Sequence, residues 1–316
     1  MEYITLKNSD LRVSRLCMGG CPMGGYGWGE VDEQALVNAV HTALEEGVTF
    51  FDTADTYGLG QSERTLCKAL GTARKDVVIA SKFGVRVENG HTFYDNSPAY
   101  IEKAVCASLE RLRTDYIDLY QIHYRDGKTP LGEVVEKLEE LKTRGLIRAY
   151  GLSNIFAADI PEIQGTVSRF TSFQDEYSLA CRRHEKDILQ IRNALGLTPM
   201  TWGSLGQGIL TGKYDRSCSF GKDDRRSREI YVNFHGEKLE RNLKIVDELR
   251  KISAGTGRSV AAVAIRFILD YLPESVVLAG AKKPKQVLSN AEAMDWHLSE
   301  AQMNTLLAVS RDEETK

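Results

Sequence analysis

The chain has 316 residues, of which 42% are hydrophobic and 27% charged, with 41 basic residues against 44 acidic ones. The resulting net charge of −3 gives no strong positive field, so nucleic acid and membrane surfaces are not expected as partners. The composition is typical of a globular protein, and no apolar run has the pattern of a signal peptide or the length of a transmembrane helix, which predicts a cytoplasmic location.

The chain opens with a predicted β-hairpin over residues 3–15, turning at Asn8, Ser9 and Asp10. Helical periodicity then predicts helices over 31–46, 98–112 and 130–144, with Ser97 and Thr129 as N-caps of the last two. Short apolar runs rich in β-branched or aromatic residues predict strands buried on both faces, as in parallel sheets. These strands span 16–19, 49–52, 77–82, 116–122, 147–152, 171–174, 198–202 and 275–278.

Eight strands, each followed by a helix or a helical candidate, predict the α/β class and a closed (β/α)8 TIM barrel. We expect one domain over residues 1–316, with the hairpin across the barrel bottom and a C-terminal helical extension. A doubly wound open sheet shows the same alternation, but the glycine spacing GxGxxG is absent. The charged segment 212–236 predicts a mobile loop on the strand-end face.

The six cysteines, at positions 17, 21, 67, 106, 181 and 218, form no CxxC pair and are expected to be free, buried thiols. The sequence also lacks HxH and HExxH spacings, so no metal site is expected.

Four polar residues lie where predicted strands end. Asp52 and Tyr57 occur in FFDTADTYG, Lys82 in VVIASKFG and His123 in YIDLYQIH. Functional side chains of parallel barrels gather at this end of the strands, so we expect these four residues to form one site.

Together these side chains could perform acid–base chemistry. A lysine at the end of a buried strand needs a counter-ion, and Asp52 on a neighbouring strand is the nearest candidate. A free tyrosine has a pKa of about 10, and we expect the ammonium of Lys82 to lower the pKa of Tyr57 and make it a usable acid. His123 could donate a hydrogen bond to a substrate oxygen.

Five segments of the sequence carry a resemblance to the aldo-keto reductase family that covers nearly the whole chain. They are FFDTADTYGLGQSE, SLERLRTDYIDLYQIH, LKTRGLIRAYGLSN, GQGILTGKY and GAKKPKQVLSN. The resemblance implies a TIM barrel that uses NADP(H), with NAD also possible, and has no Rossmann domain. It also implies that Tyr57 is the proton donor, that Lys82 and Asp52 tune it, and that His123 orients the carbonyl group.

The resemblance further implies a nucleotide site. Ser153, Asn154 and Gln174 match positions that hold the nicotinamide carboxamide, and Trp202 matches the aromatic residue that stacks on the ring. The positions that approach the pyrophosphate and the adenosine end are Gly203, Ser204, Leu205, Gln207, Gly208, Gly280, Lys282, Lys283, Gln286 and Asn290. Two lysines suit a 2′-phosphate, whereas the TWGSLGQG segment departs from the aromatic-Ser-Pro-Leu pattern usual in the family.

Substrate walls are expected from the loops that follow strands one, three and four. The candidates are Tyr26, Trp28, Arg86, Phe93, Tyr94, Tyr124 and Arg125. The aromatic residues favour planar or sugar-like carbonyl compounds, and the arginines tolerate a hydroxylated or anionic substrate. The sequence thus predicts an NADPH-dependent carbonyl reductase. The alternatives are an NAD-dependent sugar or polyol dehydrogenase and a non-catalytic regulatory subunit that senses the nucleotide; the oligomeric state is not indicated.

Overall fold

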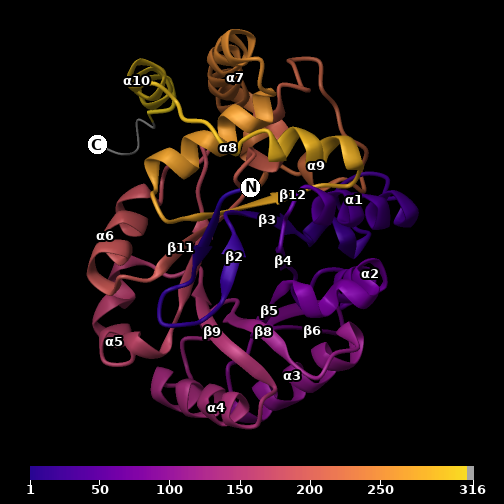
Figure 1. Cartoon of the computed structure of the whole chain (residues 1–316), viewed down its shortest axis with the longest axis vertical. Coiled ribbons are helices and arrows are strands. Elements are labelled where there is room, and N and C mark those ends of the chain that lie inside the picture. Colours follow the sequence, from indigo (N-terminus) through magenta and orange to yellow (C-terminus); the bar gives the residue numbers. More distant parts are fainter. Residues whose placement is uncertain (312–316) are drawn as a thin grey trace.

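The computed structural model describes residues 1–311 and contains the expected closed barrel of eight parallel strands with helices around it (Figure 1). Neighbouring strands follow one another in chain order, and the last strand pairs with the first to close the barrel. The barrel strands are β3 (Leu16–Gly19), β4 (Phe50–Asp52), β5 (Val78–Phe83), β8 (Ile117–Ile122), β9 (Ile147–Ser153), β10 (Ser172–Glu176), β11 (Thr198–Trp202) and β12 (Val276–Gly280).

The strand ends are level where the site is expected. Gly19 of β3 is in register with Asp52 of β4 and with Gly280 of β12. Strands β10 and β12 each run two residues beyond the predicted end. This extension places Gln174 in the middle of β10 instead of at the end of the strand, and its buried side chain reaches Asp52.

Helices surround the barrel and extend it at one end. They are α1 (Glu33–Glu45), α2 (Gln61–Leu70), α3 (Pro98–Leu112), α4 (Leu131–Thr143), α5 (Ile160–Gln164), α6 (Glu185–Leu195), α7 (Gly236–Thr256), α8 (Val260–Tyr271), α9 (Pro284–Ala291) and α10 (Glu300–Val309). Ser97 caps α3 as predicted, by accepting a hydrogen bond from the backbone N–H of Tyr100. The prediction for Thr129 was wrong, because its hydroxyl donates to Asp126 and α4 has no side-chain cap.

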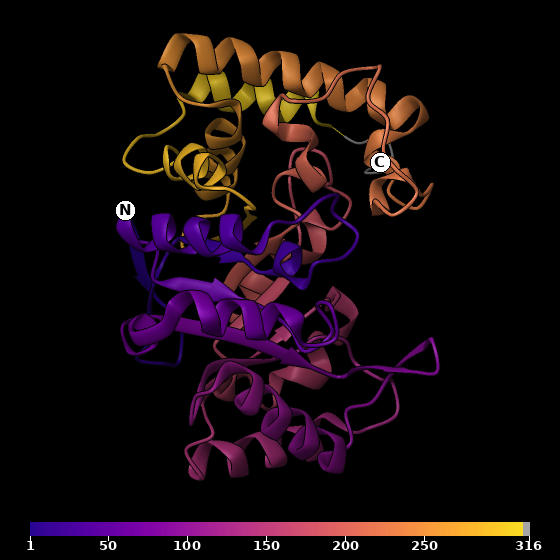
Figure 2. The ribbon, with the colours of Figure 1, turned by 90° about the vertical axis from the view of Figure 1, so that its right-hand side faces the viewer.

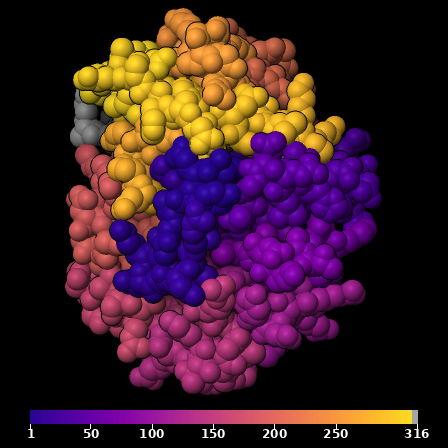
Figure 3. Space-filling view, in the orientation of Figure 1, coloured from indigo at the N-terminus to yellow at the C-terminus, as the bar shows by residue number. Residues whose placement is uncertain are grey.

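The N-terminal hairpin is present as β1 (Tyr3–Thr5) and β2 (Arg12–Ser14), and it crosses one opening of the barrel (Figures 1 and 3). Its apolar side chains Leu6, Leu11 and Val13 are buried in one cluster with Cys17 and Phe50 of the barrel interior. Complete burial of each large apolar side chain contributes roughly 1.5–3 kcal/mol, so the hairpin is a stable plug for the barrel bottom.

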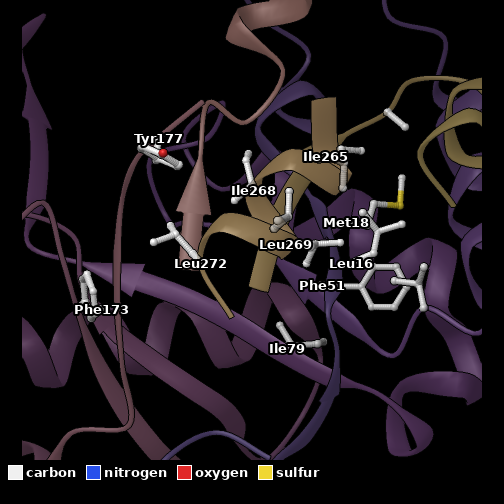
Figure 4. Packing of buried hydrophobic residues seen from close by; sticks show 14 of the residues in the cluster. Leu16, Met18, Phe51, Ile79, Phe173, Tyr177, Ile265, Ile268, Leu269 and Leu272 are labelled. Atoms are coloured by element: carbon white, nitrogen blue, oxygen red, sulfur yellow. The ribbon is translucent and has the colours of Figure 1, made fainter. Parts of the chain in front are cut away.

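A second, larger apolar cluster fills the layer between the strands and the helices. Leu16 and Phe51 on the strands lie close to Ile265, Ile268 and Leu269 of α8, as Figure 4 shows. Because helix α8 is buried from Ala261 to Leu269, it belongs to the core of the fold and not to its surface. In the described part of the chain no single helix is long and apolar enough to cross a membrane; α7 and α8 pass such a test only as a pair, bent by 97°.

Two features at the other end of the barrel differ from the prediction. An antiparallel hairpin of β6 (Val85–Glu88) and β7 (His91–Tyr94) projects from the molecule (Figure 2). The segment 212–236, predicted to be a mobile loop, contains two 3₁₀ turns, Arg225–Ser227 and Val232–Phe234. It folds back on the loop after β3, where the backbone N–H of Arg225 donates to the carbonyl of Gly27 at 3.0 Å.

The first residues are tied to the last third of the chain. Glu2 pairs with Arg15 at 2.9 Å and with the fully buried Arg266 of α8 at 2.6 Å.

The cysteines are free, as expected, but only Cys17 and Cys181 are buried, so the prediction that all six thiols are buried was wrong. In particular, one face of α3 reaches solvent and exposes Cys106 there.

Candidate active site

Three predicted site residues lie together at the carboxyl-terminal ends of the barrel strands: Lys82, Asp52 and Tyr57. The ammonium of Lys82 lies 2.6 Å from Asp52 Oδ1 and 2.9 Å from the carbonyl oxygen of Thr53, and it is 3.5 Å from the hydroxyl of Tyr57. Lys82 and Asp52 are both buried, so each charge depends on the other for its stability.

Two glutamines complete the surroundings of Asp52. Gln174 donates to Asp52 Oδ2 at 2.9 Å and Gln121 donates to the same oxygen at 3.3 Å. The side-chain amide nitrogen of Gln174 therefore donates to the carboxylate, and it also lies 3.3 Å from the side-chain oxygen of Gln121. Gln121 was missed at the sequence level, although it lies on β8 two residues before His123, which directly follows the strand, and the alternation of side chains puts both on the same side.

The expected lowering of the Tyr57 pKa is wrong for this structure. Burial raises the pKa of Tyr57 well above its ordinary value, and the negative charge of Asp52 acts in the same direction. Because Lys82 is already neutralised by Asp52, its ammonium does not offset the cost of burying a phenolate. Tyr57 is consequently a protonated phenol at neutral pH.

His123, the fourth residue predicted for this site, lies beside Tyr57. Its ring meets that of Tyr57 edge to face with centroids 6.0 Å apart, and it stacks on Tyr124 at 5.1 Å. Burial lowers the pKa of His123 well below its ordinary value, and the nearby Lys82 charge lowers it further. The imidazole is thus neutral and can donate one N–H to an oxygen placed beside the Tyr57 hydroxyl.

A buried polar cluster supports this site from the helix side. Glu63 of α2 accepts hydrogen bonds from Ser81 at 2.6 Å and from Arg111 at 2.5 Å. Asp55 lies nearby with its Oδ1 buried and unpaired, and burial with the Glu63 charge raises its pKa to about 8. Ser81 directly precedes Lys82, so its hydrogen bond to Glu63 fixes the backbone segment that carries Lys82.

Ser153 and Asn154 lie next to the site at the end of β9. The hydroxyl of Ser153 donates to the carbonyl of Gln174 at 2.8 Å, and the Asn154 amide donates to the carbonyl of His123 at 2.9 Å. Asn154 has a φ of 54°, in the left-handed region that asparagine tolerates better than most residues. These bonds set the relative positions of β8, β9 and β10 at their ends.

The loop after β11 contains the residues expected near the pyrophosphate. The side chain of Ser204 is buried and hydrogen-bonded to Thr201, which leaves only its backbone for a ligand. Gln207 and Gly208 have φ values of 54° and 105°, so a tight non-helical turn interrupts the 3₁₀ helix Gly206–Thr211. Trp202 is partly buried against the interior cluster. Of the remaining expected residues, the structure places Gly203 and Leu205 in this same loop.

The late segment places Lys282 against the loop that follows β3. Lys282 donates to the carbonyl oxygens of Trp28 at 2.6 Å and Glu30 at 3.1 Å. Burial lowers the pKa of Lys282, and so does repulsion from Arg226, Lys213 and Lys283. Gln286 accepts from the backbone N–H of Lys282, Asn290 is buried on α9, and Gly280 ends β12.

This donor set fits a phosphate-bearing nucleotide, because the positive charges of Arg226, Lys213 and Lys283 act on Lys282 together against the carboxylate of Asp224. Within residues 1–311 no group of three potential metal ligands occurs.

The expected substrate walls are only partly as predicted. Tyr94 stacks on Tyr124 with ring centroids 5.1 Å apart, which extends the aromatic array from His123 toward the β6–β7 hairpin. Trp28 meets Tyr231 edge to face and donates its indole N–H to Cys21 at 3.3 Å. Phe93, the remaining aromatic candidate, lies on β7.

The two arginines predicted for the substrate pocket are neutralised by carboxylates. Arg86 pairs with Asp95 at 2.7 Å and also with Glu88. Arg125 makes a two-pronged contact with Glu162 at 3.1 and 2.9 Å. Since a paired guanidinium attracts an anion only weakly, these ion pairs give no support to the expectation that the two arginines accept an anionic substrate.

A different arginine occupies the mouth of the site. The guanidinium of Arg225 lies over the ring of Tyr26 at 5.3 Å from its centroid, and the exposed Arg228 donates to the Tyr26 hydroxyl at 2.9 Å. Both come from the segment 212–236, whose sequence gave no sign that it would reach back to the loop after β3.

Comparisons with known proteins agree with this geometry. The family profile described as Aldo/keto reductase family matches residues 15–311. The aldo-keto reductase YhdN of Bacillus subtilis is 34% identical, over 97% of this chain and 94% of that protein. A solved glycerol dehydrogenase from Gluconobacter oxydans is 35% identical, with a TM-score of 0.87 over 97% of this chain and 94% of that chain. An aldo/keto reductase from Klebsiella pneumoniae, solved in complex with NADP and acetate, is 26% identical, with a TM-score of 0.74 over 96% of both chains.

Proposed function

Because the chain belongs to the aldo/keto reductase family and is therefore an NAD(P)-dependent oxidoreductase, we propose that it reduces aldehydes or ketones with NADPH and that Tyr57 is the proton donor. The observation that carries the proposal is the cluster of Tyr57, Lys82, Asp52 and His123 at one end of the barrel, with Lys82 between the phenol and the carboxylate. The reaction is reversible in principle.

A reduced nicotinamide, when bound, supplies the hydride that the carbonyl carbon receives. Tyr57 gives its proton to the developing alkoxide, and it is suited to this because burial keeps the phenol protonated at neutral pH. The neutral imidazole of His123 donates a hydrogen bond to the same oxygen and orients it.

In the resting site Asp52 holds Lys82, and Lys82 can stabilise the phenolate on Tyr57 only if it moves toward that oxygen as the proton leaves. Its ammonium lies between the phenol oxygen at 3.5 Å and Asp52 at 2.6 Å. A small movement of the ammonium away from Asp52 would therefore strengthen its interaction with the phenol oxygen. Gln121 and Gln174 keep Asp52 in place through their amide groups while this happens.

The residues that would hold the nucleotide follow from the donor set described above. Ser153, Asn154 and the side-chain amide of Gln174 would meet the carboxamide, and Trp202 would meet the ring. Lys282 and Lys283 at the start of α9 would meet a 2′-phosphate, which favours NADPH over NADH. The Klebsiella pneumoniae relative in complex with NADP supports this choice.

The decisive test is Tyr57→Phe, assayed by oxidation of NADPH against a panel of aldehydes and ketones. Loss of a positioned acid lowers turnover by about 10²–10⁴-fold, while the affinity for NADPH should stay unchanged. Tyr3→Phe is the matched control, because Tyr3 lies at the barrel bottom and its hydroxyl bonds to Gly47. A Tyr57→Phe protein with full activity would contradict the assignment, and tight NADPH binding without turnover of any carbonyl compound would favour a regulatory subunit.

Oxidation of polyols is the second candidate, because the structural relative from Gluconobacter oxydans is a glycerol dehydrogenase. The same four residues serve the reverse reaction, in which Tyr57 accepts the proton. Initial rates with NADP⁺ or NAD⁺ and glycerol, compared with rates of carbonyl reduction at the same pH, distinguish the two directions. A higher kcat/KM with a polyol and NAD⁺ than with any carbonyl compound and NADPH would favour the dehydrogenase.

A further inference from the structure

Arg225 is a cation at the barrel mouth that lacks a carboxylate partner. In the described part of the chain it forms no ion pair, whereas its neighbour Arg226 pairs with Asp224 at 2.5 Å. Arg225 is nevertheless a partly buried residue. A cation that loses hydration without gaining an anion is unfavourable by itself, and an incoming anion removes that cost.

The backbone and the packing hold Arg225 in place. Its N–H donates to Gly27 at 3.0 Å, and a methyl group added at Gly27 would lie 2.6 Å from the Arg225 side chain. Gly27 has a φ of 79°, so the close approach depends on glycine at this position. With Tyr26 beneath the guanidinium, the side chain is pre-oriented before any substrate arrives.

The two neighbouring arginines face opposite parts of the site. Arg226 lies over Phe220 at 4.4 Å from the ring centroid and repels Lys282, so it belongs to the nucleotide side. Arg225 instead acts on the catalytic end. Burial is the main cause that raises the pKa of Tyr57 and of Cys21, and the Arg225 charge acts against it on both.

The open cavity beside this region does not suit an anion. It has a volume of about 420 Å³, lies between the segments 25–30 and 219–224, and includes the acidic residues Glu30, Asp223 and Asp224 in its lining. Arg225 is not among its lining residues. The same loop contacts Tyr57 at Gly24 and Arg225 at Gly27, so an anion attracted by Arg225 is expected on the Tyr57 side of the loop.

We propose that Arg225 binds an anionic group of the substrate, so that the preferred carbonyl compounds carry a carboxylate or a phosphate. The planar guanidinium can donate two parallel hydrogen bonds to either group, while His123 and Tyr57 meet the carbonyl oxygen at the other end. This inference rests on the proposed carbonyl reductase function. It assigns the specificity to a residue outside the four that carry the chemistry.

The test compares matched pairs of aldehydes that differ in an anionic group. Butanal is paired with succinic semialdehyde for the carboxylate, and glyceraldehyde with glyceraldehyde 3-phosphate for the phosphate. Wild-type protein should show a higher kcat/KM for at least one anionic member. Arg225→Gln should lower that kcat/KM by about 10- to 100-fold, mainly through KM, the loss expected for a charge-assisted hydrogen bond. The neutral members should change less than about threefold.

Two further variants make the result specific. Arg225→Lys keeps the charge without the planar fork, and should retain an intermediate preference for the anionic member. Arg216→Gln removes a charge from the same segment, where Arg216 is exposed and paired with Glu240, and should leave the preference unchanged. The preference of wild-type protein should also weaken with added salt.

Three results would overturn the inference while leaving the carbonyl reductase intact. They are equal kcat/KM for both members of each pair in wild-type protein, equal losses for both members in Arg225→Gln, and a matching loss of NADPH affinity that assigns Arg225 to the nucleotide. Wild-type protein without turnover of any carbonyl compound would overturn the proposed function itself, and this inference with it.

Discussion

Separating the structural from the chemical role of Lys82 requires the variants Lys82→Met, Asp52→Asn and their combination. Lys82→Met removes the 2.6 Å ion pair and the bond to Thr53, and it leaves the Asp52 carboxylate buried. Breaking a buried pair from one side costs about 3–5 kcal/mol of unfolding free energy. The two glutamine amides that still donate to Asp52 should keep the loss near the lower end of this range.

The double variant should be more stable than the sum of the two single losses predicts, by about 1–3 kcal/mol, because the uncompensated charge is gone. Urea-induced unfolding followed by circular dichroism measures this coupling. NADPH oxidation, measured on the same samples, should be lost in all three variants, since the recovered stability does not restore an ammonium beside Tyr57. Additive free energies within about 0.5 kcal/mol, or activity recovered in the double variant, would refute the reasoning.

Further predictions concern the surroundings of the site. The Asp55 pKa of about 8 lies above the value of 3.8 for an exposed aspartate, so the free energy of unfolding should fall as pH rises between these values. Urea titrations at several pH values should show that Asp55→Asn removes this fall. The control Asp76→Asn, at an exposed position, should keep it. Gly58→Ala should lower kcat at least tenfold, because the added Cβ meets a backbone oxygen of the neighbouring loop and φ is 61°; NADPH binding measured in parallel should persist. Lys282→Ala should weaken NADPH binding at least tenfold and NADH binding less than threefold in calorimetric titrations, with a smaller effect for the exposed Lys283→Ala, and equal wild-type affinity for both nucleotides would contradict a 2′-phosphate contact.

The sequence was sufficient for the barrel and for the four central residues. Strands buried on both faces produce continuous apolar runs, so their ends, and with them Asp52, Lys82 and His123, can be placed within a residue or two. The partners of Arg86 and Arg125 could not be found in the same way. Glu162, for example, comes from a different βα unit, and only the closed barrel brings it to Arg125.

One missed element did leave a signal. The β6–β7 hairpin turns at Asn89 and Gly90, both with positive φ, and Asn-Gly between alternating residues is a strong hairpin pattern. The reach of Arg225 back to Gly27 left no comparable signal, because the 197 intervening positions contain most of the barrel. Contacts of this kind depend on the global topology and not on local propensity.

The pairing of β3 with β12 and the contact of Glu2 with Arg266 also constrain the order of folding. While the nascent chain leaves the ribosome, the edge of β3 has no neighbour on one side until almost nine-tenths of the protein has been made. Parallel pairing over such a separation is slow, so a half-assembled sheet with an open edge is an expected target for chaperones. The carboxylate of Glu2 reaches the buried guanidinium of Arg266 only when the barrel has closed.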